Sequence, residues 1–586
     1  MCGIAGLILK TKSEPPSPTV LEALNKALAH RGPDGAHQCI IDDTALLHTR
    51  LAIIDLKGGD QPLYAGSAAL IANGEIYNYK ELRSKFTETE FKTHSDSELP
   101  LQLWLHEGTN YVEKLRGMYA IALHDRSNNT TVLSRDPFGI KPLYLAKIDQ
   151  GYAFASEPQA LIAAGLVKPK IHAQARRELL QLQFSSGSDT IFEGIRRVLP
   201  GETLIFRDGE ILERRHEPAL PDAKPERITE SEALKRLDKA LEESIDLHLR
   251  SDVPYGMFLS GGVDSATILS VASRLKSQPM RTFTAGFDAP GAADEREKAE
   301  RVARVCGAEH ESILVTEEMV WRHLPEIVAC MDDPVTDFAI IPTWFLAQRA
   351  RAEVKVVLSG EGGDEIFAGY GRYRSAMRPW WLGGKKLRTR GAFTQLDVLR
   401  DTSPHWRDGV ALAEAEANTP HRTRLAAAQA TDCADWLAHG LLTKLDRCLM
   451  AHGVEGRTPF LDRGIVEAAF LLPDALKVQG RSGKWILRQW LQQHLPEARP
   501  FDRKQGFTVP VGAWINNQGA RLGELVARQP GVIEIAEPAK VIRLFKDCAA
   551  KREGNAAWRL LFYALWHQRH ILGLSSEGDV FEALCP

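Results

Sequence analysis

The chain has 586 residues, of which 44% are apolar and 25% are charged, so it is long enough for two or more domains with their own cores. Its formal net charge of −3 gives no electrostatic reason to expect a nucleic-acid or anionic-membrane partner. No apolar span is long enough to cross a bilayer, and the N-terminus lacks the pattern of a secretory signal. The eight cysteines lack C-x-x-C spacing, which argues against a zinc site or a disulfide framework and indicates the cytoplasm.

The first residues carry a candidate nucleophile. The chain opens Met1-Cys2-Gly3, and removal of Met1 would leave Cys2 as the N-terminal residue. Its α-amine titrates near neutrality, so it can act as the base for the thiol of the same residue. The plain alternative is a small buried cysteine near a chain end. The polar clusters further along the chain favour the nucleophile.

A helix is predicted next, followed by strands. Ser17 and Pro18 suit an N-cap and a first helical position, and apolar residues follow at helical spacing as far as Leu28. The turn-rich residues 31–35 end this helix.

Three polar clusters interrupt the strand-like segments: Arg50, the run Asn73-Gly74-Glu75, and residues 95–98 with Asp96. An arginine fork suits the α-carboxylate of an amino-acid substrate, and carboxylates or carbonyls suit its amine. The Asn73 side chain and the Gly74 N–H could donate to the oxyanion that forms when a thiolate attacks an amide. Each cluster alone is more often a turn. Together with Cys2 they form a coherent amidase site.

The composition changes near residue 217. Residues 217–228 contain three prolines and few apolar residues, which is typical of a linker. Thr229 and Glu232 then match a capping box ahead of a helical apolar period. We therefore predict one domain at residues 2–215, a linker at 216–228 and a second domain at 229–586.

The second domain contains the most informative stretch, Ser260-Gly261-Gly262-Val263-Asp264-Ser265, between an apolar strand and a helix. Adjacent glycines expose backbone N–H groups at a helix N-terminus, so the turn can hold an anion. Ser260 and Ser265 could donate to phosphate oxygens, and Asp264 could hold Mg²⁺. No lysine follows the glycines, so this is not a loop of the P-loop type. The plain alternative is an ordinary strand–helix turn.

Further strands alternate with helices along the second domain. Residues 281–287, 310–315 and 354–358 are predicted strands, which indicates a parallel sheet with its ligand at the carboxyl ends of the strands. The last of them runs into residues 359–365, a second glycine-rich turn that carries Glu361 and Asp364. Clustered carboxylates beside a phosphate loop would repel ATP unless Mg²⁺ lay between them. The alternative is an exposed acidic loop. Residues 371–440 are predicted to be helical.

These motifs resemble those of glutamine-hydrolysing asparagine synthetases, a family in which a class II glutamine amidotransferase domain is fused to an ATP-pyrophosphatase-type synthetase domain. The similarity covers about residues 2–515 and includes segments 1–6, 31–34, 50–53, 73–78, 95–96, 117–120, 134–144, 154–157, 199–201, 260–265, 359–365, 452–462, 483–488 and 503–507. It implies an α+β N-terminal-nucleophile αββα sandwich. An α/β parallel-sheet domain of the adenine nucleotide alpha hydrolase-like type would follow.

The resemblance also assigns roles to residues. Glutamine would be attacked by Cys2 and held by Arg50, Asn73, Gly74, Glu75 and Asp96. ATP would contact Phe258, Ser260, Gly261, Gly262, Asp264, Ser265, Ala285, Ser359 and Gly360, with Mg²⁺ on Asp264 and Asp364. Glu361 would act in forming and consuming an acyl-adenylate. A lysine near the α-phosphate would stabilise its charge, and motif position favours Lys504 over Lys484. The alternative is that Lys484 and Lys504 are both surface lysines with no role in the reaction.

The implied reaction is ATP-dependent amidation of aspartate through a β-aspartyl-AMP intermediate, with AMP, pyrophosphate and glutamate as the other products. Ammonia from the glutaminase site would reach the second site through a buried tunnel. Related lactam-forming synthetases lack the N-terminal cysteine, so Cys2 argues against that branch of the family. The resemblance is compatible with a homodimer.

Two departures leave the acceptor open. The second loop reads Glu-Gly-Gly-Asp-Glu, and residues 503–507 end in Gly-Phe. Relatives that amidate other carboxylates, such as peptide- or glycan-linked ones, carry similar variants. A glutaminase with a regulatory nucleotide-binding module is a second alternative, and the intact Asp264, Glu361 and Asp364 weigh against it. A non-catalytic scaffold would require two complete sites by accident.

Overall fold

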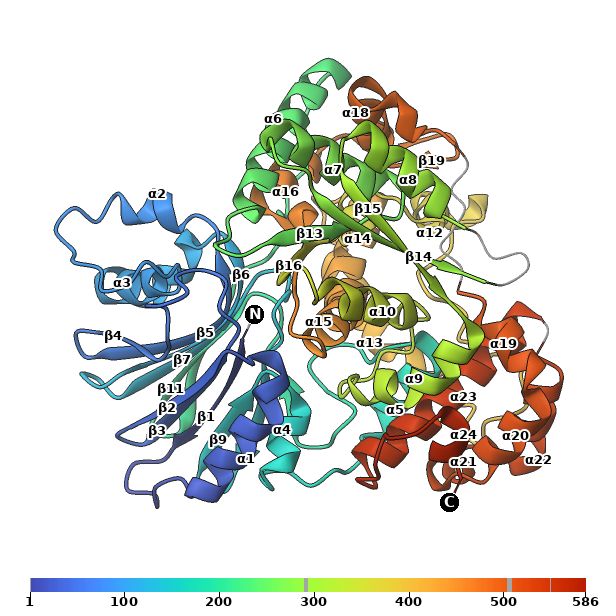
Figure 1. The fold of residues 1–586 in the computed structure, drawn as a ribbon, viewed down its shortest axis with the longest axis horizontal. Coiled ribbons are helices and arrows are strands. Elements are labelled where there is room, and N and C mark those ends of the chain that lie inside the picture. The colour runs from blue at the N-terminus through green and yellow to red at the C-terminus, as the bar shows by residue number, and fades with distance from the viewer. Residues whose placement is uncertain (1, 289–293, 503–508, 549, 586) are drawn as a thin grey trace.

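A computed structural model describes residues 2–288, 294–502, 509–548 and 550–585 of the chain (Figure 1). Two antiparallel sheets fill the N-terminal part, and a parallel sheet flanked by helices fills the C-terminal part. This arrangement confirms the predicted fold class. None of the helices in these described ranges has the length and apolar character that a bilayer span requires.

The N-terminal part is a sandwich of two six-stranded sheets. The first sheet has the order β10 (Ile195–Arg197), β8 (Tyr144–Ile148), β9 (Gly151–Ala155), β1 (Gly3–Leu9), β3 (Thr44–Arg50) and β2 (Gly35–Ile41). The second has the order β12 (Glu210–His216), β11 (Glu202–Arg207), β7 (Thr130–Arg135), β6 (Gly117–Asp125), β5 (Ala68–Ile76) and β4 (Leu63–Ala65). Ile4, Leu46, Ile71 and Leu133 belong to the apolar layer between the sheets.

Helices cover the outer faces of the sandwich. Helices α1 (Pro18–Leu28) and α4 (Pro158–Ala163) pack on the first sheet, and α2 (Tyr79–Arg83) packs on α3 (Glu98–Glu107). Helix α5 (Ala173–Leu182) contacts α23 (Lys551–His570) of the C-terminal part. Helix α1 begins at Pro18, with Ser17 at the N-cap, and buries Leu21, Leu24 and Leu28 against the first sheet, as its spacing predicted. Helix α3 packs on β4 and β5 of the second sheet. The result is the predicted four-layer αββα order.

The C-terminal part is built on a five-stranded, wholly parallel sheet. Its order is β15 (Glu309–Val315), β14 (Arg281–Phe287), β13 (Tyr255–Phe258), β16 (Val356–Leu358) and β17 (Glu455–Arg457). The strand order reverses between β13 and β16. A binding crevice forms at such a switch point because the loops after the two strands diverge there.

Helices lie on both faces of this sheet (Figure 1). The α-helices described in the C-terminal part are, in chain order, α6 (Glu230–His248), α7 (Val263–Leu275), α8 (Arg296–Val305), α9 (Glu317–Ala329), α10 (Ile340–Ala350), α11 (Gly363–Ile366), α12 (Gly371–Met377), α13 (Asp408–Ala417), α14 (Arg424–Asp432), α15 (Leu442–Met450), α16 (Arg463–Ala469), α17 (Asp474–Lys477), α18 (Trp485–His494), α19 (Val511–Asn517), α20 (Gly519–Ala527), α21 (Pro530–Ile535), α22 (Pro538–Lys546), α23 (Lys551–His570) and α24 (Val580–Ala583). The helices from α19 onward pack on one another and on α9. A π-helical segment at Cys433–Leu441 leads into α15. The helices within residues 371–440 agree with the prediction, whereas residues 383–403 form no helix.

The segment between the two parts is extended and packs against the C-terminal part. It has no helix or strand from residue 217 to 229, but Leu220 is buried and the Glu226 N–H donates to Leu471 O at 2.8 Å. The capping box that follows is present: Thr229 Oγ1 accepts from the Glu232 N–H, and Glu232 Oε2 accepts from the Thr229 N–H at 3.1 Å. The domain boundaries themselves stay a prediction.

Candidate active sites

Cys2 lies immediately before β1 and is almost completely buried. Its N–H donates to Asn73 Oδ1 at 3.1 Å, and Arg31 Nε donates to its carbonyl oxygen at 3.2 Å. Burial raises the pKa of the Cys2 thiol. The thiol therefore needs a local base before it can attack an amide.

Asn73 and Gly74 stand beside this thiol on β5. The Asn73 side chain is fully buried, and its Nδ2 has no hydrogen-bond partner among the described residues. Gly74 has a φ of +155°, and a Cβ there would lie 2.0 Å from Met118 O, so only glycine fits. A buried amide donor without a partner is costly. It fits a site where an oxyanion develops next to Cys2.

Two buried carboxylates, Glu75 of β5 and Asp96 shortly before α3, lie close to each other. Asp96 Oδ2 accepts from the Ile76 N–H at 2.7 Å, and burial raises the pKa of Asp96 to about 6. Burial, and then the nearby Asp96 charge, raise the pKa of Glu75 well above its usual value. Arg457 Nη2, from the C-terminal part, lies 3.4 Å from Glu75 Oε2. These groups can accept from a substrate amine when Asp96 is ionised.

Arg50 ends β3, and the register that pairs Thr49 with Gly3 brings Arg50 beside Cys2. Its guanidinium is buried and already partnered. Nη1 donates to Asp60 Oδ1 at 2.8 Å and to Leu56 O at 3.2 Å. The predicted glutamine residues thus come together around Cys2, with the Arg50 fork held in place by residues 54–60.

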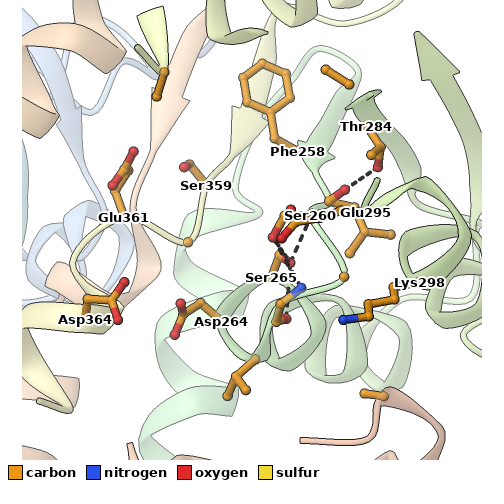
Figure 2. Close-up of a pocket in the computed structure, with 18 of the residues that line it drawn as sticks. Phe258, Ser260, Asp264, Ser265, Thr284, Glu295, Lys298, Ser359, Glu361 and Asp364 are labelled. Carbon is orange, nitrogen blue, oxygen red and sulfur yellow. Dashed lines mark hydrogen bonds between the residues drawn. The ribbon is translucent and has the colours of Figure 1, made fainter. Parts of the chain in front are cut away.

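The second site is a cavity of about 360 Å³ at the carboxyl ends of the parallel strands (Figure 2). Every predicted ATP contact lines it: Phe258, Ser260, Gly261, Gly262, Asp264, Ser265, Ala285, Ser359 and Gly360. Glu361 and Asp364 line it as well. The structure therefore brings the two glycine-rich loops into one pocket.

The loop after β13 has the shape that a phosphate site requires. Gly261 has a φ of +67°, and a Cβ there would lie 2.8 Å from both Ala299 N and Lys298 Cβ. The Ser260 N–H donates to Ser265 Oγ at 3.2 Å, which ties the loop to the first turn of α7. Backbone N–H groups and the helix N-terminus then face the cavity, an arrangement that favours anions.

The two candidate metal carboxylates converge on one lysine. Lys484 Nζ lies 2.8 Å from Asp364 Oδ1 and also donates to Asp264. Burial alone would lower the pKa of Lys484, but the two carboxylates raise it above its usual value. Asp264 Oδ1 is buried without a hydrogen-bond partner among the described residues. Lys504, the lysine favoured by motif position, lies outside the described residues.

A further lysine in this pocket was missed by sequence reasoning. Lys444 of α15 is buried, with Nζ 3.1 Å from Glu361 Oε1 and 3.5 Å from Asp337 Oδ2. Burial alone would lower the pKa of Lys444, but Glu361 and Asp337 raise it above its usual value. One sequence signal was available, because Lys444, Asp446 and Arg447 interrupt an apolar stretch that would otherwise be a plain core helix.

The two sites meet at β17. The Ser359 N–H, in the ATP pocket, donates to Arg457 O at 2.8 Å. The Arg457 side chain approaches Glu75 on the other side, as described above. One residue therefore touches both candidate sites.

Comparison with known proteins agrees with this geometry. A family model described as asparagine synthase matches residues 236–568, and one described as a glutamine amidotransferase domain matches residues 1–217. The chain is 31% identical to asparagine synthetase [glutamine-hydrolyzing] 1 of Bacillus subtilis, with 97% of each chain covered. It is 29% identical to asparagine synthetase B of Escherichia coli, covering 90% of this chain and 85% of that protein. It is also 31% identical to the amidase chyE of Penicillium rubens, covering 64% of this chain and 60% of that protein.

Proposed function

The chain belongs to the family of glutamine-hydrolysing asparagine synthetases, and from that premise we propose that it amidates aspartate with ammonia from glutamine at the cost of ATP. One observation carries the proposal. The same chain joins two features: a buried cysteine beside an amide donor that has no partner in the described part of the chain, and a cavity lined by two glycine-rich, carboxylate-bearing loops.

The first half-reaction takes place at Cys2. With Met1 removed, the α-amine of Cys2 accepts the thiol proton, and the thiolate attacks the side-chain amide of glutamine. Asn73 Nδ2 and the Gly74 N–H donate to the oxyanion, which accounts for a buried amide that has no partner within the described ranges. The C–N bond breaks with proton transfer to nitrogen, so ammonia leaves. Water then hydrolyses the thioester and releases glutamate.

The second half-reaction takes place in the 360 Å³ cavity. The aspartate side-chain carboxylate attacks the α-phosphate of ATP, and pyrophosphate leaves from the loop at residues 260–265. Ammonia then attacks the acyl carbon of β-aspartyl-AMP, and AMP departs with the oxygen of the former carboxylate. We assign the cation beside the α-phosphate to Lys484, because its Nζ contacts both Asp264 and Asp364 in the cavity.

Mg²⁺ fits the carboxylates of this cavity. Among the described residues, Asp264 Oδ1 is a buried acceptor without a hydrogen-bond partner, and hard cations prefer carboxylate and phosphate oxygens. Asp264 and Asp364 would hold the ion, which supplies positive charge to the departing pyrophosphate. We further propose a cytoplasmic location, since all eight cysteines are free in the structure.

A second acceptor class is supported by the apolar residues that line the cavity. Ala339, Pro342 and Leu346 line the same cavity as Glu361, and their apolar side chains suit the stem of a larger carboxylate better than the polar ends of free aspartate. One relative carries the name amidase rather than synthetase. The second candidate is therefore the same chemistry on a peptide- or glycan-linked carboxylate.

Isotope transfer tests the proposal. Glutamine labelled with ¹⁵N in its side-chain amide is supplied with ATP, Mg²⁺ and aspartate, and the products are analysed by mass spectrometry. We expect asparagine that carries the label in its amide. If labelled ammonia forms while aspartate stays unconverted, aspartate is not the acceptor. A screen of other carboxylates for uptake of the label would then test the second candidate.

A further inference from the structure

Helix α15 of the C-terminal part places the carboxylate of Asp446 against Arg31 of the N-terminal part. Asp446 is buried and accepts two parallel hydrogen bonds from Arg31, with Nη1 at 2.8 Å from Oδ2 and Nη2 at 3.0 Å from Oδ1. This bidentate geometry fixes both the position and the plane of the guanidinium. Although burial alone would raise the pKa of Asp446, Arg31 holds it below its usual range.

The guanidinium of Arg31 also contacts the backbone of the nucleophile Cys2. The Arg31 side chain is fully buried, and every guanidinium nitrogen donates. Nε donates to the carbonyl oxygen of Cys2 at 3.2 Å, and Nη1 also donates to Glu157 Oε1 at 2.7 Å. A planar group fixed by two carboxylates can hold the third contact, Cys2 O, at a defined place.

Arg447, the next residue of α15, is linked to strand β1, which follows Cys2, through Ser156. Arg447 Nη2 donates to Ser156 O at 3.4 Å. Ser156 in turn holds β1, because its Oγ accepts from the Ile4 N–H at 3.0 Å and its own N–H donates to Ile4 O at 2.8 Å. Arg447 is itself fixed by Asp332, with Nε 2.6 Å from Oδ1.

We propose that Asp446 and Arg447 are positioning residues for the glutaminase reaction, supplied to the nucleophile strand by the ATP-binding part of the chain. The inference rests on the proposed function. Catalysis by a thiol requires its sulfur at a defined distance from the oxyanion donors, and a small displacement lowers the rate constant. Loss of Asp446 would also leave the buried Arg31 charge without one of its two carboxylates.

The same helix faces the ATP pocket. Lys444, two residues before Asp446, contacts Glu361 at 3.1 Å. Helix α15 thus contributes to both centres, so the glutaminase depends on the ATP-binding part for its geometry.

The test is the Asp446→Asn variant of the full chain, which keeps the shape of the side chain and removes its charge. Glutamate release from glutamine is measured over a range of glutamine concentrations, and pyrophosphate release is measured with free ammonia as the nitrogen source. We expect the glutaminase kcat to fall at least about tenfold, with KM and the ammonia-dependent rate each within about twofold of wild type.

A matched control separates positioning from general loosening of the interface. Asp333 of the C-terminal part makes a similar buried, bidentate pair with Arg197 of β10, at 2.7 Å for both contacts. The other hydrogen bonds of Arg197 go to Gly187, Asp189 and Ser185 rather than to the nucleophile strand. Asp333 also accepts from Tyr144 Oη, which Arg447 Nη2 contacts at 3.3 Å, and the amide oxygen of an asparagine keeps that acceptor. The Asp333→Asn variant should therefore keep its glutaminase kcat within about twofold.

Two results would overturn the inference: wild-type glutaminase kcat in Asp446→Asn, or equal losses in Asp446→Asn and Asp333→Asn. Absence of glutaminase activity in the wild-type chain would instead reject the proposed function. Folding is checked by circular dichroism. If Asp446→Asn does not fold, Arg447→Lys is tested by the same criteria, because lysine keeps the charge but cannot contact Ser156 and Asp332 together.

Discussion

At the scale of single residues, Cys2 separates the two proposed half-reactions. Cys2→Ala removes the sulfur but keeps a small side chain at a buried position beside β1. We expect this variant to lose glutamine-dependent synthesis completely and to keep synthesis from free ammonia, since the ATP cavity contains no part of the nucleophile strand. Both activities are followed by pyrophosphate release, with the wild type assayed alongside. A folded variant that has lost both would contradict the assignment of separate sites.

Asp96 gives the glutaminase a predicted pH dependence. Burial raises the pKa of its carboxyl to about 6. A carboxylate that binds the glutamine ammonium must be ionised, so its binding form disappears as the pH falls through that value. We expect KM for glutamine to rise below pH 6, by about tenfold for each further pH unit. Asp96→Asn should show a high KM with no such step, and a wild-type KM that stays flat from pH 7 to 5 would rule out this role.

At the scale of elements, the loop after β13 depends on Gly261. Its φ of +67° disfavours a side chain, and a Cβ would collide with the Ala299 backbone. Gly261→Ala therefore combines roughly 1–2 kcal/mol of backbone strain with a displaced loop. We expect KM for ATP to rise at least about tenfold, with unchanged glutaminase activity.

Gly307 offers the matched control for this loop variant. It has a nearly identical φ of +66°, but nothing lies within 4 Å of a Cβ built there. Gly307→Ala carries the strain without the collision and lies outside the ATP cavity. Its KM for ATP should match the wild type, and an increase equal to that of Gly261→Ala would attribute the effect to general destabilisation.

Elements with a regular apolar period or a local cap could be predicted from the sequence. Helix α1 and the start of α6 follow their N-cap signals, and β14 spans the residues predicted for it. Strand β17 could not be predicted, because Glu455 and Arg457 read as exposed charges. In the fold both are buried, and Arg457 is paired with Glu455 and near Glu75. The local sequence around a buried charged residue does not identify a partner that lies in a distant segment.

At the scale of the whole molecule, the same limit applies to how the two parts join. Sequence motifs identified both candidate sites, and the structure brings together those of their residues that it describes, whereas Lys504 lies outside the described residues. The joint itself rests on pairs such as Arg31 with Asp446, which are 415 residues apart. Such pairs follow no periodic pattern, so Lys444 and the residues beside it on α15 emerged only from the structure.

The central claim is that both sites work on one reaction, and pyrophosphate release tests it most directly. The wild-type chain is supplied with ATP, Mg²⁺ and glutamine, with and without aspartate, and pyrophosphate, glutamate and asparagine are measured together. We predict that pyrophosphate appears only with aspartate and in amounts equal to the asparagine formed. Glutamate formation with no aspartate-dependent pyrophosphate would contradict the account.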